Sequence, residues 1–303
     1  MSTPCTHIFL VGLPRSGTTL MTAMLNASTD IGISIAESHY LARTRGSGRT
    51  PRPSFREKID AAGDLATEAG LRKIVDLIYD EPELFWRPIV AQMDRAEFCE
   101  RLMQSDRTHR ALFELAMRIH AGRKPICGEK TPGHVLHVPT LLEWFPDAKI
   151  VNIVRDPRAT YVSQIIKRET HNRGLAGSAL RRVALLRDLV ISTGFIRGWN
   201  RALGLHLKYQ ARYPDQYRLV RYEDVVTQPE TTLRELCRFL GVEFSDGMVT
   251  GQVNLNSSYT GARQASGIDT QAIDRWRAHM SPLIRQWFNL WCNKPAGRYG
   301  YVL

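Results

Sequence analysis

Apolar residues occur along this 303-residue chain in two alternating patterns. Mainly apolar runs of the length and kind found in buried strands stand at residues 8–11, 125–128, 149–154 and 217–221. Between them, apolar residues recur with the spacing of one helix face, as in residues 18–25, 132–144, 175–211, 229–240 and 271–293. Because strands and helices alternate, the pattern predicts an α/β fold with a parallel sheet flanked by helices, in a single domain over residues 1–303.

Three stretches depart from this alternation. Residues 31–38 alternate apolar and small residues and end in polar ones, which predicts a second strand with Glu37 at its C-terminal tip. Residues 43–56 are basic and rich in Gly, Pro and Ser, so we expect a loop, either a cover over an anionic ligand or a solvated linker. The chain from there to residue 122 has helical periodicity and no strand signal. The pattern over residues 43–122 therefore predicts a helical insertion over the sheet edge.

The turn between the first strand and the first helix has the composition of a phosphate-binding loop. Its glycines have the spacing of a Walker A loop, but Thr18 stands where that motif has lysine. Because the lysine serves triphosphate chemistry, its loss argues against ATP as the substrate. Arg15 in this loop supplies a planar cation in place of the lysine. The sheet is otherwise expected to be of the P-loop type. The expected phosphate ligands in this turn are Arg15, Ser16, Gly17, Thr18 and Thr19.

A second candidate phosphate site, distinct from the first loop, follows the strand over residues 149–154. Arg155 stands at the tip of that strand, and Ser163 lies in the helix after it. In open α/β sheets, ligands bind beyond the carboxyl ends of the strands, so this site, Glu37 and Lys130 are expected at one edge. Each residue also has a purely structural interpretation. Arg155 could form a surface ion pair with an aspartate, and Glu37 could be a helix cap or part of a surface salt bridge.

Charge and composition narrow the function classes. The formal net charge of +11 favours an anionic partner, such as a phosphorylated cofactor, an acidic substrate, nucleic acid or a membrane surface. The five cysteines form no CxxC pair, and His134 and His137 have no third ligand nearby, so no disulfide framework and no metal site is predicted. No apolar run approaches the ~20 residues of a membrane helix, and no signal-peptide pattern is present. We therefore expect no transmembrane segment and a cytoplasmic location.

Taken together, the motifs resemble the sulfotransferase family that uses 3′-phosphoadenosine 5′-phosphosulfate (PAPS). The resemblance extends from residue 7 to about residue 276, apart from residues 43–122, and is closest to the bacterial and tyrosylprotein-sulfotransferase-like branch. The segments that carry it are GLPRSGTTL (12–20), EKTP (129–132), FPDAK (145–149), VRDPRATYVS (154–163) and RYED (221–224).

This resemblance implies PAPS as the sulfuryl donor and a role for each site residue. Glu37 would be the general base that takes the proton of the acceptor hydroxyl, and Arg15 and Lys130 would face the leaving 3′,5′-bisphosphate. His39 is the second choice for the base, and we expect its side chain on the face opposite to Glu37. The resemblance further places Arg155 and Ser163 on the 3′-phosphate, Tyr222 near the adenine, Ser257 near the transferring sulfuryl group and Arg275 near the phosphates.

The sequence does not name the acceptor. Glu37 lies in IAESHY, which differs from the GEET-like context of the tyrosylprotein enzymes, so a small-molecule, glycan or lipid acceptor is favoured over protein tyrosine. Two other functions stay open. A P-loop kinase of a small metabolite is disfavoured by Thr18, and a nucleic-acid-binding protein is disfavoured by the dispersed positive charge, so no nucleic acid is expected as partner. A homodimer is left open.

Overall fold

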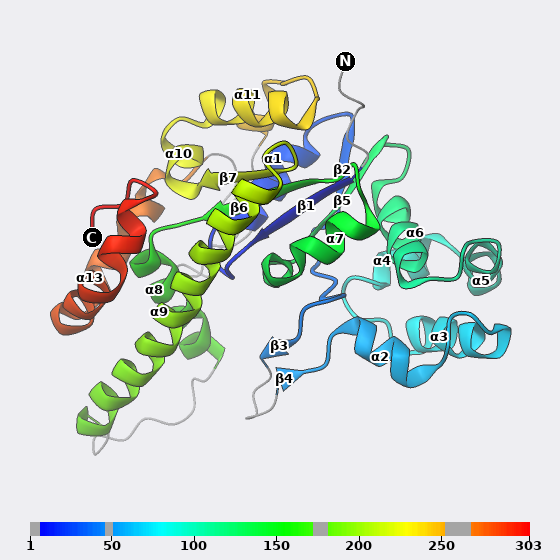
Figure 1. Cartoon of the computed structure of the whole chain (residues 1–303), viewed down its shortest axis with the longest axis horizontal. Helices are drawn as coiled ribbons and strands as arrows, with labels where there is room; N and C mark the ends of the chain where they lie inside the picture. The colour runs from blue at the N-terminus through cyan, green and yellow to red at the C-terminus, as the bar shows by residue number, and fades with distance from the viewer. Residues whose placement is uncertain (1–6, 46–50, 172–180, 252–267) are drawn as a thin grey trace.

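A five-stranded sheet forms the centre of the protein, whose computed structural model describes residues 7–45, 51–171, 181–251 and 268–303 (Figure 1). The strand order is β2-β5-β1-β6-β7, and every neighbouring pair is parallel. The predicted fold class, a parallel sheet flanked by helices, is confirmed. The strands are β1 (His7–Gly12), β2 (Ile31–Ile33), β5 (Ile126–Lys130), β6 (Lys149–Val154) and β7 (Tyr217–Arg221).

The central strand β1 is apolar on both faces because helices cover both sides of the sheet. Ile8 and Leu10 belong to one buried cluster, which includes residues of α1 (Thr18–Asn26) and α11 (Pro229–Leu240). Phe9 and Val11 belong to a second cluster, with residues of α7 (Val138–Trp144) and of the helices in the N-terminal half. Successive strand side chains point to opposite faces, so an unbroken apolar run is what a doubly covered strand requires.

A helical block between β2 and β5 extends to the right in Figure 1 and rests on the sheet through its last helix. It confirms the predicted helical insertion. The aromatic side chains of Phe85 and Trp86 are buried inside this block and form part of its core. The helices are α2 (Phe55–Ala62), α3 (Glu68–Asp80), α4 (Arg87–Gln92), α5 (Arg95–Met103) and α6 (His109–Ala121).

Three helices pack on one another beside β6 and β7 and form a third buried cluster. Of these, the long helix α9 runs across the front of the view in Figure 1. They are α8 (Pro157–His171), α9 (Arg181–Arg212) and α13 (Pro282–Gly297), and the short helices α10 (Tyr222–Thr227) and α12 (Gly247–Thr250) complete the described set.

Two predictions in the N-terminal half are wrong. The second strand ends at Ile33, because the chain turns at Ser34, whose hydroxyl donates to the carbonyl oxygen of Ala36 at 3.1 Å. Glu37 therefore lies in a loop after the strand and not at its tip. Residues 43–56 are not entirely loop, since β3 (Thr44–Arg45) and β4 (Pro51–Arg52) pair antiparallel and α2 has already begun.

Two predicted helices are divided. The segment predicted as a helix over residues 271–293 contains the 3₁₀ turns Thr270–Ile273 and Arg275–Ala278 and then α13. Ser281 caps α13 by accepting from the backbone N–H of Ile284, and Pro282 occupies the first turn, so the sequence does restart a helix there. The helix predicted over residues 132–144 begins likewise with a 3₁₀ segment, Pro132–His137, before α7.

Candidate active site

The loop between β1 and α1 turns at two glycines with positive φ, 150° at Gly12 and 102° at Gly17. A Cβ atom on Gly17 would lie 2.2 Å from Cδ2 of Tyr222, and one on Gly12 would lie 2.5 Å from the carbonyl oxygen of Ile153. Only glycine fits both the backbone conformation and the space. The loop is therefore pressed against β6 on one side and the Tyr222 ring on the other.

The first turn of α1 points its backbone donors at the loop. Gly17 is the N-cap residue, no side chain caps the helix, and the first turn contains no acidic residue. The first N–H groups of a helix have no intrahelical acceptor and carry the positive end of the helix dipole. Thr18 and Thr19 thus present donors of the kind that a phosphate-binding loop needs.

Arg15 connects the loop to the site predicted after β6. Its Nε donates to Oγ of Ser163 at 3.1 Å, and Nη1 of Arg155 donates to the carbonyl oxygen of Arg15 at 3.3 Å. The sequence predicted two distinct phosphate sites, whereas here both arginines and Ser163 are in contact. The two predicted sites adjoin, and we call Arg15, Arg155 and Ser163 the cationic patch.

Arg155 is buried within this patch. Its guanidinium lies 4.2 Å from the centre of the Tyr222 ring, and its Nη2 donates to the carbonyl oxygen of Ala272 at 2.6 Å. Burial raises the pKa of Tyr222, although the charge of Arg155 opposes that shift. Arg155 makes no surface pair with the aspartate that follows it in the sequence, because that aspartate pairs with Arg158 at 2.7 Å.

Two buried polar atoms beside the loop have no hydrogen-bond partner among the described residues, namely Oγ of Ser16 and Nε of Arg155. A buried polar atom without a partner is costly, and phosphate oxygens would accept a hydrogen bond from each. The residues present therefore fit a phosphorylated ligand.

The remaining predicted contacts lie toward the C-terminus. Arg275 pairs with Asp269, with Nη2 and Oδ2 2.5 Å apart. Arg275 begins the second 3₁₀ turn, which packs against α8, while the first turn packs against α10. Ser257 lies outside the described residues.

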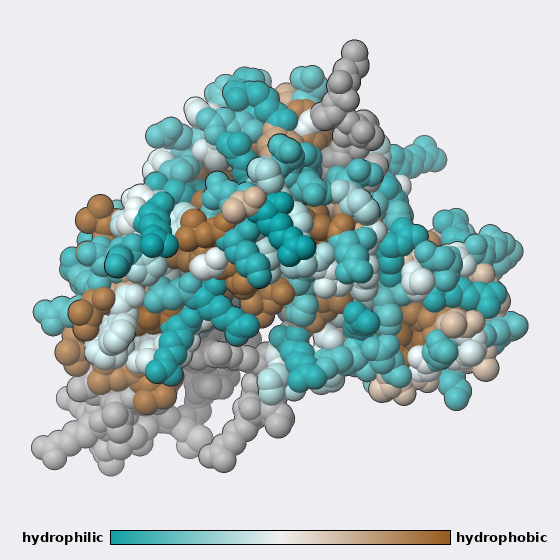
Figure 2. Space-filling model, viewed as in Figure 1, coloured by the Kyte–Doolittle hydropathy of each residue, from teal (hydrophilic) through white to brown (hydrophobic). Residues whose placement is uncertain are grey.

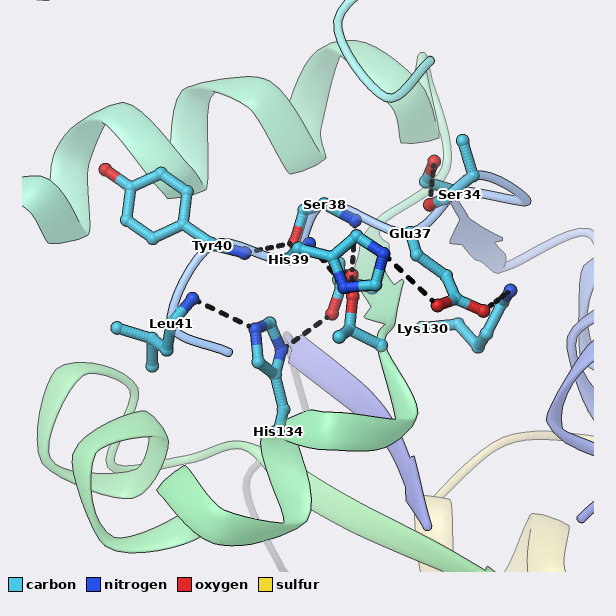
Figure 3. Close-up of polar contacts among 11 residues, drawn as sticks. Ser34, Glu37, Ser38, His39, Tyr40, Leu41, Lys130 and His134 are labelled. Atoms are coloured by element: carbon cyan, nitrogen blue, oxygen red, sulfur yellow. Dashed lines mark hydrogen bonds and ion pairs between the residues drawn. The ribbon is translucent and has the colours of Figure 1, made fainter. Parts of the chain in front are cut away.

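A lysine and a carboxylate meet on the other side of β1. Nζ of Lys130 donates to Oε1 of Glu37 at 3.0 Å, as Figure 3 shows. The Lys130 side chain is 5% exposed, whereas the Glu37 side chain is 36% exposed. Lys130 pairs in register with Leu10 of β1, close to the start of the phosphate loop. The structure thus brings Glu37 and Lys130 together at the edge where the loop lies.

His39 faces Glu37, contrary to the expectation that it points to the opposite side. Its Nε2 lies 3.5 Å from Oε2 of Glu37 (Figure 3). The expectation is wrong in its strand geometry, because residues two apart on a strand share a face. The strand has in any case ended at Ile33, and His39 adopts a left-handed conformation with φ 48°. Burial lowers the pKa of His39, with the Glu37 carboxylate opposing that shift.

Glu129, a residue to which the sequence assigned no role, contacts the residue between Glu37 and His39. Its Oε1 accepts from the backbone N–H and the hydroxyl of Ser38 at 3.0 and 2.9 Å and from the hydroxyl of Thr131, and its Oε2 lies 3.0 Å from Nδ1 of His134. Glu129 is 1% exposed. The signal that could have found it is a carboxylate in a buried strand, since such a group is rarely buried unless paired.

A sequence profile described as the Sulfotransferase family matches residues 7–246. The chain belongs to the sulfotransferase family. Protein-tyrosine sulfotransferase 1 of Danio rerio is 27% identical over 278 residues, which cover 89% of this chain and 65% of that protein. Omega-hydroxy-beta-dihydromenaquinone-9 sulfotransferase Stf3 of Mycobacterium bovis is 32% identical over 133 residues, which cover 44% of this chain and 33% of that protein. This chain therefore spans less than two thirds of the length of these relatives.

Solved sulfotransferase structures share the fold over the whole chain. The sulfotransferase domain of the Synechococcus PCC 7002 olefin synthase matches with a TM-score of 0.57 and 21% identity, covering 100% of this chain and 97% of that domain. The sulfotransferase domain of the curacin biosynthetic pathway matches with a TM-score of 0.56 and 19% identity over 100% of both chains.

In this sulfotransferase-family chain, the described residues contain no group of three or more His, Cys, Asp or Glu side chains that could hold a metal ion. Of the two histidines considered for a metal, His134 is buried against Glu129. Within the same ranges, no helix is both long enough and apolar enough to cross a membrane. The described cysteines are buried free thiols: Cys99, Cys127, Cys237 and Cys292.

Proposed function

We propose that this protein is a PAPS-dependent sulfotransferase that transfers a sulfuryl group to the hydroxyl of a small-molecule, glycan or lipid acceptor, with Glu37 as the general base. The observation that carries the proposal is the pairing, at one sheet edge, of a phosphate loop without lysine and the Lys130–Glu37 ion pair on the neighbouring strand. A P-loop kinase holds its lysine inside the loop, whereas this chain has Thr18 there and its buried lysine on β5.

The proposed donor has two phosphate positions, and the site offers ligands for both. The first turn of α1 and Arg15 would hold the 5′-phosphosulfate, and the neighbouring Arg155 and Ser163 would hold the 3′-phosphate. Tyr222, whose ring lies against Arg155, would be near the adenine through the family resemblance. Arg275 near the phosphates and Ser257 near the sulfuryl group belong to the same proposal through the family resemblance.

The proposed reaction is a displacement at sulfur. The acceptor oxygen bonds to sulfur while the bond from sulfur to the bridging phosphate oxygen breaks, and that electron pair leaves with the 3′,5′-bisphosphate. The hydroxyl proton goes to Glu37, a step that contributes about 10²- to 10⁴-fold in rate for a positioned base. Lys130 and Arg15 face the charge on the leaving group, and fixed cations aimed at developing charge stabilise such transition states.

The loop that carries Glu37 favours a non-protein acceptor. In this chain Glu37 shares its loop with His39, in a context unlike the GEET-like one of tyrosylprotein enzymes, which supports a non-protein acceptor. Its relatives include both protein-tyrosine sulfotransferases and a dihydromenaquinone sulfotransferase. Incubation with radiolabelled PAPS and, in parallel, a lipid alcohol, a glycan and a tyrosine peptide compares these classes directly. Label transferred only to the tyrosine peptide would overturn the acceptor assignment.

Substitution of Glu37 tests the base. Glu37→Gln keeps the shape of the side chain but removes the basic carboxylate, so kcat should fall about 100-fold or more. Affinity for 3′,5′-bisphosphoadenosine, measured by calorimetry, should stay within about 2-fold, because the change lies outside the cationic patch. Glu230→Gln, at an exposed carboxylate of α11, is the matched control and should behave as wild type. A fully active Glu37→Gln enzyme would exclude Glu37 as the base.

A further inference from the structure

We propose that Glu129 is a positioning residue that holds Glu37 in place, acting through the backbone of residues 38–41 and through His134. This inference rests on the proposed function, in which Glu37 is the base. We call Glu129, Ser38, Thr131 and His134 the carboxylate hub; two of its members, Ser38 and His134, are labelled in Figure 3 near Glu37 and His39.

The hub is built around a buried negative charge. Burial by itself would raise the pKa of Glu129, but the hydrogen bonds from the His134 ring, the Thr131 hydroxyl and the Ser38 backbone N–H lower that pKa below its ordinary value. Glu129 is therefore ionised at neutral pH and can only accept hydrogen bonds. Each donor around Glu129 must therefore point its hydrogen toward the carboxylate. This fixes the orientation of the backbone N–H and the hydroxyl of Ser38.

His134 transmits this orientation to Leu41. The backbone N–H of Leu41 donates to Nε2 of His134 at 3.1 Å, so that nitrogen carries no hydrogen. The ring hydrogen then sits on Nδ1, which donates to Oε2 of Glu129 at 3.0 Å. The chain of bonds has a single direction, from Leu41 through His134 to Glu129.

The loop between these two anchor points is held in the same way. The N–H of His39 donates to Oγ1 of Thr131 at 3.3 Å, and the N–H of Tyr40 donates to Oγ of Ser38 at 3.2 Å. His39 keeps its positive φ inside this frame. A strained conformation of this kind persists where the surroundings over-determine it.

Glu129 and Lys130 act on the loop from different directions. As neighbours on β5 their side chains leave the strand on opposite faces. Lys130 contacts the carboxylate of Glu37, while Glu129 holds the backbone of the next residue, Ser38. The distance from the base to its cation is thus set by the end of one strand.

An isosteric substitution of Glu129 removes a hydrogen bond from the carboxylate hub while keeping the space filled. In Glu129→Gln, an amide nitrogen replaces one carboxylate oxygen and meets the Nδ1 hydrogen of His134. If His134 changes tautomer to accept from that amide, its Nε2 hydrogen meets the N–H of Leu41. One buried bond is lost in either case, and kcat should fall about 10-fold or more, because small displacements of a positioned group cost rate. Affinity for 3′,5′-bisphosphoadenosine should stay within about 2-fold.

Two further variants separate the hydrogen bond between His134 and Glu129 from the one between Leu41 and His134. His134→Asn keeps a donor near the Nδ1 position and loses the acceptor for Leu41, and His134→Gln does the reverse. Each should lower kcat less than Glu129→Gln. Lys124→Met is the stability control, because Lys124 donates to the carbonyl oxygens of Asn26, Ser28 and Ile31 at the other end of the strands. It should lower the melting temperature and leave kcat unchanged.

The deciding test combines Glu129→Gln with Glu37→Gln. If Glu129 acts through Glu37, its substitution should have almost no further effect on kcat in the Glu37→Gln background, whereas a general structural role would multiply the two losses. Multiplicative losses would overturn the proposal.

Hydrogen exchange of the wild type and of Glu129→Gln supplies a readout that needs no activity. The amides of residues 38–41 should exchange faster in the variant, with those of α1 unchanged. Unchanged exchange at 38–41 would overturn the positioning role even in an active enzyme. If exchange changes as expected but the wild type transfers no sulfuryl group from PAPS to any acceptor tested, the proposed function fails, and with it the role of Glu37 that the hub would serve.

Discussion

The two halves of the candidate site are built in different ways. On the side of β1 and β6, the proposed ligands follow directly from strand ends: Arg15 lies in the loop after β1, and Arg155 is the first residue after β6. On the side of β5, Glu37 lies in a loop whose orientation depends on Glu129, a partner 91 residues away from Ser38 in the sequence. The first half is organised locally, and the second by contacts between distant segments.

This difference predicts how each half responds to substitution. A loop formed by glycine geometry and helix N–H groups offers few side chains to alter, so changes there should act on the binding of the phosphorylated ligand. A loop held by a carboxylate hub can shift while the fold persists, so changes there should act on turnover. The following experiments test that division, beginning with the largest expected effect.

Gly17→Ala should break the phosphate half. Its Cβ would lie 2.2 Å from the Tyr222 ring at a φ of 102°, so the loop or the ring must move. We expect affinity for 3′,5′-bisphosphoadenosine, measured by calorimetry, to fall about 100-fold or more, together with a loss of about 1–3 kcal/mol in stability. Gly204→Ala in α9, where nothing lies near the added Cβ, is the control and should be neutral or slightly stabilising. Unchanged affinity in Gly17→Ala would show that the loop does not bind the phosphate.

Arg155→Ala should weaken binding in a way that depends on the ligand. We expect the affinity for 3′,5′-bisphosphoadenosine to fall about 10- to 100-fold, because a charged hydrogen-bond partner of the 3′-phosphate is lost. Affinity for adenosine 5′-phosphosulfate, which has no 3′-phosphate, should change much less. Arg234→Ala removes an exposed arginine from α11 and serves as the control. Equal losses for both ligands would remove Arg155 from the 3′-phosphate site.

The carboxylate hub should make the stability of the protein depend on pH in the acid range. Although burial raises it, the hydrogen bonds that Glu129 accepts lower its pKa from an ordinary value of 4.5, so its contribution to stability is present above about pH 4.5 and is lost as the pH falls through the lowered pKa. Glu129→Gln should therefore be less stable than wild type at neutral pH, by about 1–3 kcal/mol, and the gap should narrow as the pH falls below about 4.5. Denaturant unfolding at a series of pH values measures the gap. A constant gap across this range would mean that Glu129 is not the titrating group.

Much of the phosphate half could be predicted from the sequence, because its elements depend on neighbours along the chain. The apolar run of β1, the two glycines and the start of α1 are consecutive, and Arg155 follows β6 directly. Even the break before α13 has a local signal, a serine followed by proline, which the helical periodicity obscured.

The hub half could not be predicted in the same way. Periodicity extended the second strand to residue 38, but the turn at Ser34 ends it at Ile33, so Glu37 and His39 both lie in the loop that follows, where their side chains meet. Nothing near Glu129 in the sequence indicates that Ser38 and, through His134, Leu41 complete its hydrogen bonds.

The sequence by itself determined the α/β fold, the phosphate loop and the residues at the strand ends. Backbone hydrogen bonding and apolar periodicity specify these within a few residues of chain. The tertiary structure alone decided which side chains face Glu37 and that the two predicted phosphate sites adjoin at Arg15. The physical reason is that a buried polar group must find its partners wherever packing brings them, and those partners belong to segments that meet only in the folded chain.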